Sequence, residues 1–324
     1  MTPRRAAGEI WEIQMRIHKM EPGRDTLHGA FFRDMPPALT IDPGDTVIFR
    51  TLEAGWRLEP PDPSGDEHIF EDYRPEWRGD GHALCGPVEV RGAKPGTTLE
   101  VKIGEIRPGP WGRTNAGGAH RALNERLGVE KLDVRLIWTL DLDTMTARDQ
   151  HGHTVMLRPF MGVMGMPQDE PEQQSTVPPR TTGGNVDCKE LVPGSSLFLP
   201  VAVDGALFSV GDGHAAQGDG EVSGTAIECP MERVELTFRL HENLQISTPR
   251  ALTPAGWISF GFHRNLDEAT TIALDAMLDL MGELFDMERG VAMALASVSV
   301  DLRVTQVVNQ VSGVHAVLPH GAVR

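Results

Sequence analysis

The feature that most constrains the fold is the even scatter of glycine and proline along the chain. There are 35 glycines and 24 prolines in 324 residues, and they separate short segments that alternate in polarity or are rich in β-branched residues. Segments of this kind, bounded by turn residues, are typical of a β-sandwich or jelly roll. We expect strands over Ala38–Ile41, Thr46–Arg50, Val88–Val90, Thr98–Ile106, Leu132–Leu140, Leu197–Val203 and Val234–Leu240.

Helical signals appear only late in the chain. The segment Leu266–Leu284 carries apolar side chains at helical spacing, and Asn265 precedes it as a cap with Glu268 three residues further on. A second helix is predicted over Met287–Val298, after which Asp301–Leu318 returns to strand-like alternation. The predicted class is mainly β, with sandwich or jelly-roll sheets and a small α+β C-terminal part that contains two helices.

The length of the chain favours two domains, because 324 residues exceed the usual size of one compact core. The polar, proline-rich segment 168–182 is predicted to be an exposed linker. It would separate an N-terminal β-rich domain, residues 1–167, from a C-terminal β domain, residues 183–324, which carries the helical hairpin and a glycine-rich loop.

Charge and cysteine content exclude several classes of protein. With 30 basic and 46 acidic residues the formal net charge is −16, which argues against a nucleic-acid partner. Three cysteines, Cys85, Cys188 and Cys229, do not make a disulfide framework and favour a reducing compartment. The N-terminus lacks the apolar stretch of a secretory signal, and no run of about 20 apolar residues could span a membrane. We therefore expect a cytoplasmic protein.

The richest chemical signal is the glycine-rich segment Phe208–Glu228. Asp212 and His214 lie two residues apart, so on a strand they would share one face and could hold a divalent ion or pair as acid and base. If Asp-x-His stood alone in the sequence, a turn with a surface histidine would be the better explanation. Because Gln217, Asp219 and Glu221 follow in the same loop, between apolar segments, we favour a functional site with partners for its buried acids.

Three other places carry candidate site residues. Gly183 and Gly184 allow a close backbone approach, and Asn185 and Asp187 follow on one face, where an amide and a carboxylate could position and activate a substrate. The isolated His28 and His82 are, taken alone, more typical of core or surface histidines. The chain contains no HExxH, CxxC, P-loop or GxSxG motif.

Taken together, these segments resemble the acetamidase/formamidase family over nearly the whole chain. The resemblance is carried, in order, by His28–Phe49, Gly86–Ile103, Arg158–Pro167 (RPFMGVMGMP), Gly183–Val201, Gly205–Glu228 (GALFSVGDGHAAQGDGEVSGTAIE) and Asp301–Asn309. It implies hydrolysis of short aliphatic amides to a carboxylate and ammonia, a β-sandwich-like fold and a homo-oligomer. Family positions rich in acids and histidine are matched by Asp187, Asp212, His214, Glu221 and Glu228. The chain departs from the family pattern at Cys85, where the family has threonine, and at Arg33, which displaces the acid Asp34.

An amide is hydrolysed only if a nucleophile is activated, the oxyanion is stabilised and the leaving nitrogen is protonated. A mixed histidine and aspartate site suits a divalent ion, preferably Zn²⁺. Our hypothesis assigns the ligands, the general base, the oxyanion donor and the substrate-binding residues as follows. The ligands are His82, Asp187, Asp212 and His214; the base is Glu221 or Glu228; Asn185, with loop amides, holds the oxyanion; His28, Gly183, Gly184 and Gln217 bind substrate.

Alternative readings remain open at the level of the sequence. Cys188, beside Asp187 and Lys189, could act as a nucleophile, although neighbours on a strand point to opposite faces and most free cysteines are inert. A non-catalytic small-molecule binding protein with a structural cation site is a second alternative. A metal-dependent decarboxylase or lyase on a cupin-like barrel is a third, disfavoured because no His-x-His is followed closely by a Glu and a later His.

Overall fold

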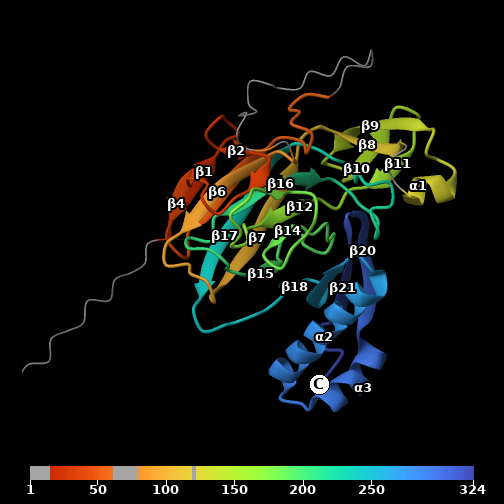
Figure 1. Ribbon diagram of the computed structural model, residues 1–324. Coiled ribbons are helices and arrows are strands. Elements are labelled where there is room, and N and C mark those ends of the chain that lie inside the picture. The colour runs from red at the N-terminus through yellow and green to blue at the C-terminus, as the bar shows by residue number, and fades with distance from the viewer. Residues whose placement is uncertain (1–14, 61–78, 80, 119–121) are drawn as a thin grey trace, which may run out of the picture.

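The computed structural model describes residues 15–60, 79, 81–118 and 122–324 (Figure 1). The helices are α1 (Ala122–Leu127), α2 (Leu266–Phe285) and α3 (Arg289–Ser299). The strands are β1 (Ile17–Met20), β2 (Leu27–His28), β3 (Ala30–Phe31), β4 (Leu39–Ile41), β5 (Thr46–Thr51), β6 (Leu84–Val90), β7 (Thr98–Pro108), β8 (Trp111–Gly117), β9 (Asp133–Asp141), β10 (Thr146–Asp149), β11 (Thr154–Met156), β12 (Phe160–Gly165), β13 (Gln174–Ser175), β14 (Gly183–Asn185), β15 (Ser196–Pro200), β16 (Phe208–His214), β17 (Met231–His241), β18 (Arg250–Thr253), β19 (Gly256–His263), β20 (Asp301–Asn309) and β21 (Val311–Pro319).

The strands form two large sheets and two smaller ones. The larger sheet has the order β1-β5-β17-β7-β15-β18-β19-β21-β20, and the second has the order β14-β12-β16-β6-β2 with β4 parallel to β6. A four-stranded sheet, β11-β10-β9-β8, and the pair β13-β3 complete the fold. The predicted mainly β class is confirmed, and every predicted strand coincides with an observed one to within a few residues.

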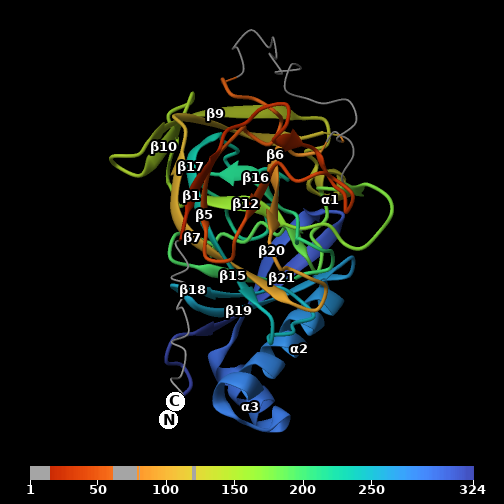
Figure 2. The same ribbon diagram turned by 90° about the vertical axis from the view of Figure 1, so that its left-hand side faces the viewer.

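The two large sheets bury a common apolar core. Phe208 on β16 meets Phe238 on β17 across the sheets, with ring centroids 5.1 Å apart in an edge-on arrangement that aromatic rings favour. Phe49 on β5 and Val88 on β6 are fully buried in the same cluster. The inward-facing side chains of both sheets therefore make a sandwich core, and β16 lies in its middle (Figure 2).

The strand order interleaves the two halves of the chain. In the larger sheet β17 lies between β5 and β7, and in the second sheet β16 lies between β12 and β6. Segment 168–182 also belongs to the body, because β13 pairs with β3 and Thr176 is fully buried. The predicted boundary therefore does not separate two sheets. The division into two domains stays a prediction. Within segment 168–182 the polar side chains form internal hydrogen bonds, such as that from Gln174 Nε2 to the carbonyl of Gln168.

The two late helices are confirmed close to their predicted bounds. The side chain of Asn265 accepts hydrogen bonds from the backbone N–H groups of Asp267 and Glu268, which caps α2 as expected. On β19, a Cβ at Gly261 would lie 2.0 Å from the carbonyl oxygen of Ala269, so glycine lets α2 rest directly on the strand. No helix among the described residues is long and apolar enough to cross a membrane.

A buried histidine in this part of the core gives the fold a sensitivity to acid. His315 on β21 has no exposed surface; its Nδ1 lies 2.7 Å from Thr305 Oγ1, and burial lowers the pKa of the imidazole to about 4. The folded state thus keeps His315 neutral, whereas the unfolded chain takes up a proton below about pH 6.5. Its contribution to stability is complete above that pH and decreases as the pH falls towards 4, by at most about 3 kcal/mol.

Replacement of His315 by glutamine is expected to remove this part of the acid response. Urea unfolding at pH 7.5 and pH 4.5 measures the free energy of unfolding of both proteins. The variant should lose less stability than the wild type between the two pH values. An equal loss in both proteins would contradict the assignment.

Candidate active site

The site is built where β12 and β16 run side by side. Asp212 and His214 end β16, and Phe160 on β12 pairs with His214 and packs its ring edge-on against the imidazole, 5.1 Å between centroids. A Cβ at Gly162 would lie 2.5 Å from Asp212 Oδ2, 2.6 Å from Asp187 Oδ1 and 2.8 Å from His214 Cε1. Only glycine leaves room for these three side chains to converge.

Two overlapping groups of metal-ligand type meet at His214. The potential ligand atoms of Asp187, Asp212 and His214 all lie within 4.8 Å of one another, and so do those of His214, Glu221 and Glu228. All five residues are at most 7% exposed. The structure thus brings together five of the residues that the sequence singled out, from two separate segments of the chain.

The tautomer of His214 is set by Gln217. Gln217 Nε2 donates to the carbonyl of Asp187 at 2.8 Å, so its Oε1 faces His214 Nδ1 at 2.9 Å and must accept the Nδ1 proton. In the neutral ring the lone pair of Nε2 then points at Asp212 Oδ1, 3.3 Å away, and at Glu228 Oε2, 3.2 Å away. A lone pair that faces two carboxylates is stable only with a proton or a metal cation between them.

The pKa shifts of the cluster residues also indicate that the site favours a bound positive charge. Burial lowers the pKa of His214, but the carboxylates of Glu228 and Asp212 outweigh it and hold that pKa well above its ordinary value. Burial and the neighbouring Glu221 carboxylate raise the pKa of Asp187 well above its usual range. Burial likewise raises the pKa of Glu228, against the opposing effect of His214. The cluster therefore holds more negative charge than its own residues neutralise.

Several buried polar atoms of the cluster lack a hydrogen-bond partner among the described residues. They are Asp187 Oδ1, His214 Nε2, Glu228 Oε2 and Asn185 Oδ1. Orphaned buried acceptors are costly unless a ligand satisfies them. One imidazole and several carboxylates, which converge beside Gly162, fit the donor set of a divalent metal ion.

A cavity of about 370 Å³ opens onto this cluster. Its wall includes the cluster residues Asp212, Glu221 and Glu228 together with Asn185, His82 and Asn309. His82, predicted to be a ligand, lies in this wall but belongs to neither group of closely spaced ligand atoms; its Nδ1 is 2.8 Å from Thr176 Oγ1. The pKa of Asp212 is lowered, against the effect of burial, first by His214 and then by the nearby His82.

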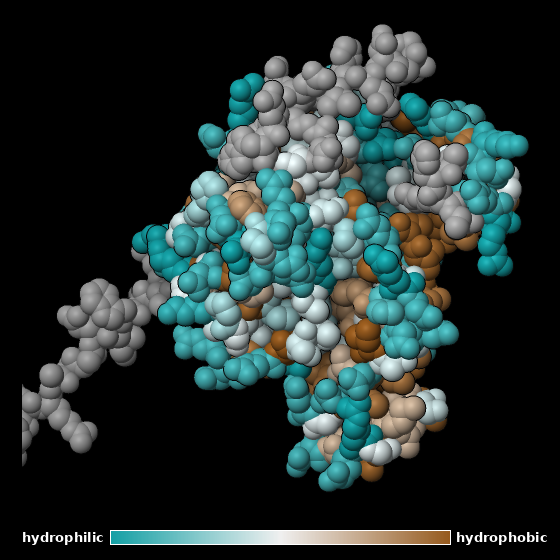
Figure 3. Space-filling model, in the orientation of Figure 1, coloured by the Kyte–Doolittle hydropathy of each residue, from teal (hydrophilic) through white to brown (hydrophobic). Residues whose placement is uncertain are grey.

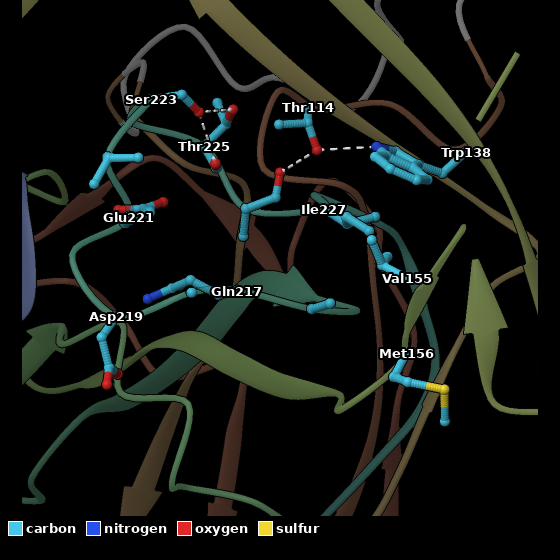
Figure 4. Close-up of a pocket in the computed structure, with 14 residues that line it drawn as sticks. Thr114, Trp138, Val155, Met156, Gln217, Asp219, Glu221, Ser223, Thr225 and Ile227 are labelled. Carbon is cyan, nitrogen blue, oxygen red and sulfur yellow. Dashed lines mark hydrogen bonds between the residues drawn. The ribbon is translucent and has the colours of Figure 1, made fainter. Parts of the chain in front are cut away.

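A second cavity of about 380 Å³ lies beside the loop 216–227 (Figure 4). Trp138, Val155 and Met156 form an apolar wall there, opposite Gln217 and Glu221. Glu221 and Thr225, from this loop, line both cavities.

The residues predicted to bind substrate are placed differently. His28 is buried, with Nδ1 2.7 Å from the carbonyl of Ala30 and Nε2 2.9 Å from Ser209 Oγ, and it does not line the cavity; this position does not support a role in substrate binding. Gly183 and Gly184 have φ of +91° and +92°, and this backbone conformation lets β14 pair with β12. Gln217 contacts His214, and it does not line the cavity that opens onto the cluster.

Three residues of the site were not predicted: Gly162, Thr176 and Asn309. Gly162 lay in the recognised segment RPFMGVMGMP, but a missing side chain gives no chemical signal. Thr176 lay in the predicted linker. Asn309 was visible as a polar residue that ends an alternating apolar segment, which could have marked it.

The structure disfavours a cysteine nucleophile. Cys188 is fully buried, and burial raises the pKa of its thiol to about 12, so the reactive thiolate is scarce near neutral pH. We expect Cys188→Ala to retain activity within about threefold and to lose at most a few kcal/mol of stability. Steady-state kinetics with thermal unfolding as a control for folding test this; loss of turnover in a folded variant would revive the covalent route.

The chain is similar in sequence and in fold to proteins named as amidases. The chain is 28% identical to the acetamidase of Mycolicibacterium smegmatis over 60% of this chain and 61% of that one, and 28% identical to the formamidase of Methylophilus methylotrophus over 61% and 60%. It thus spans less than two thirds of the length of these curated relatives. The crystal structure of acetamidase from Yersinia enterocolitica superposes with a TM-score of 0.83 at 26% identity, covering 96% of this chain and 94% of the other.

The sequence profile of one family covers almost all of the described chain. It matches residues 15–174 and 168–321, which include β12, β16 and every member of the cluster around His214. The chain belongs to the Acetamidase/Formamidase family.

Proposed function

We propose that this protein hydrolyses short aliphatic amides, of the formamide and acetamide type, to a carboxylate and ammonia at the cluster around His214. One observation carries the proposal: the Nε2 lone pair of His214 faces two buried carboxylates, with Asp187 Oδ1 close by and without a hydrogen-bond partner in the part of the chain that the structure describes. Such an arrangement supports a bound divalent ion, for which we propose Zn²⁺. The names of the similar proteins support the amide as substrate.

Asp187, Asp212 and His214 would hold the ion, with His82 as a further ligand from the cavity wall. When bound, a divalent ion supplies Lewis-acid polarisation of a carbonyl and lowers the pKa of water. The protein residues fix the geometry. Gln217 orients the imidazole, and the glycine at 162 allows the carboxylates to approach it.

Proton transfer is assigned to Glu221 or Glu228. Both are buried beside His214, and burial raises the pKa of Glu228. A carboxyl group with a raised pKa can take a proton from water and return it to the leaving nitrogen near neutral pH. Glu228 Oε1 accepts a hydrogen bond from the N–H of Ala226, which leaves Oε2 for this exchange.

The orientation of Asn185 suggests a different role from the predicted one. Its Nδ2 donates to the carbonyl of Val177 at 3.0 Å, while its buried Oδ1 has no hydrogen-bond partner among the described residues. A free acceptor does not suit an oxyanion. It suits the N–H groups of a primary amide, so we propose that Asn185 holds the substrate nitrogen.

Ammonia release from the purified full-length protein tests the proposed function. The substrates are formamide, acetamide, propionamide and N-methylacetamide, each with metal-replete protein, with protein treated with a chelator, and with treated protein to which Zn²⁺ is restored. We expect turnover of at least one primary amide, its loss after chelation and its return with metal. Absence of ammonia from every amide with metal-replete protein would refute the proposal.

We also propose that the enzyme works in the cytoplasm as a homo-oligomer. All three cysteines are free and buried, which suits a reducing compartment. On α3, Val291, Met293 and Val298 are 51%, 49% and 82% exposed, and Figure 3 shows hydrophobic surface on the side that carries the helical part. Exposed apolar groups of this extent favour contact between subunits. Light scattering coupled to size-exclusion chromatography measures the assembly.

A further inference from the structure

The C-terminal hairpin sends one side chain into the active-site cavity. Asn309 ends β20, the edge strand of the larger sheet, and yet it is only 7% exposed and lines the cavity. Its Nδ2 donates a hydrogen bond to Asp187 Oδ2. The proposed function uses Asp187 but gives Asn309 no role.

The hydrogen bond from Asn309 decides which oxygen of Asp187 faces the cluster. The backbone of Asp187 is already fixed, because its N–H donates to the carbonyl of Gly162 and its C=O accepts from Gln217 Nε2. The side chain can still rotate. With Oδ2 engaged by Asn309, Oδ1 faces Gly162 and lies 3.9 Å from His214 Nδ1, without a hydrogen-bond partner among the described residues.

Asn309 is itself held in place by the hairpin. Gln306 is fully buried, and its Oε1 accepts the N–H of Asn309 at 3.0 Å while its Nε2 donates to the carbonyl of Val311 at 2.9 Å. The strand is also joined to the loop that carries Glu221: the N–H of Gly220 donates to the carbonyl of Thr305, and the N–H of Val307 donates to the carbonyl of Gly220. The donor of Asn309 is therefore oriented before any ligand binds.

We propose that Asn309 is a positioning residue that presents a single oxygen of Asp187 to the bound metal ion; the inference rests on the proposed function. A neutral amide suits this task, because it donates a hydrogen bond without bringing a positive charge that would compete with the cation. Such residues form a hydrogen bond to the atom of a metal ligand that does not face the metal. Their removal typically lowers metal affinity or activity by about 10- to 100-fold.

The test measures metal binding as well as turnover. Asn309→Leu keeps the volume of the side chain and removes the donor, and Asn309→Ala removes both. Val307→Ala, on the exposed side of the same strand, is the matched control. The full-length proteins, stripped of metal, are titrated with Zn²⁺ by calorimetry and with Co²⁺ by absorption spectroscopy, and thermal unfolding of the metal-free forms verifies folding.

We expect both Asn309 variants to bind Zn²⁺ about 10- to 100-fold more weakly, and to give a changed Co²⁺ spectrum, while metal-free stability stays close to that of the control. A purely structural role would lower metal-free stability and leave the spectrum unchanged, which would overturn the inference. Wild-type affinity and spectrum in folded Asn309→Leu would overturn it as well. If wild-type protein bound no divalent metal, the proposed metal site itself would fail, which is a distinct result.

Discussion

His214→Ala is expected to abolish metal binding and to lower amide hydrolysis by on the order of 1000-fold or more. His214 belongs to both groups of ligand atoms, so its removal leaves the four buried carboxylates of these groups without the imidazole that the two groups share. Loss of a metal ion removes several kcal/mol of transition-state stabilisation, and each 1.36 kcal/mol corresponds to about tenfold in rate.

Metal content after dialysis and kcat/KM for the preferred amide are measured on the same samples. His241→Ala provides the matched control, because His241 contacts Glu100 on the larger sheet and does not line the cavity. Retention of stoichiometric metal by folded His214→Ala would show that the ion binds elsewhere. Retention of activity without metal would show that the chemistry needs none.

Gly162→Ala is expected to disrupt the candidate active site through the addition of a single methyl group. The new carbon would lie 2.5 to 2.8 Å from atoms of Asp212, Asp187 and His214, all of which are buried and none of which can move away without breaking the cluster. Overpacking of this kind costs about 1–3 kcal/mol of stability. We expect metal affinity and turnover to fall by at least about 100-fold, since the ligands themselves must shift.

Gly218→Ala is the control for this change, because a Cβ at Gly218 meets nothing within 4 Å although the residue lies in the loop beside the cluster. It should behave like the wild type in Zn²⁺ titration, kinetics and thermal unfolding. If Gly162→Ala bound metal with wild-type affinity, the position of the ion assumed here would be wrong.

The sequence was sufficient for elements whose signals are local. α2 has its cap at Asn265 and its apolar stripe within 20 residues, and the observed helix begins at the next residue. The convergence of Asp212, His214, Glu221 and Glu228 was also foreseeable, because the glycine-rich segment carries them all within 17 residues.

Non-local features could not be predicted from a single sequence. Nothing near β17 indicates that it inserts between β5 and β7, since strand pairing depends on partners far along the chain. For the same reason Asn309 could not be linked to Asp187, and His28, an isolated histidine without a spaced partner, was assigned to the substrate when it belongs to the core. Gly162 matters because it has no side chain to block the approach of the cluster residues, and the absence of a side chain gives no motif in the sequence.

Interleaved pairing also sets the order of events during synthesis. β7 ends at residue 108 and its neighbour β17 begins at residue 231, so residues 109–230 are translated before the pair can close. At about 5–20 residues per second this interval lasts roughly 6 to 25 seconds, during which the nascent chain exposes an unsatisfied strand edge. We therefore expect the yield of native protein in a cell to depend on how well chaperones cover this strand edge during the interval, more than on the stability of the folded sandwich.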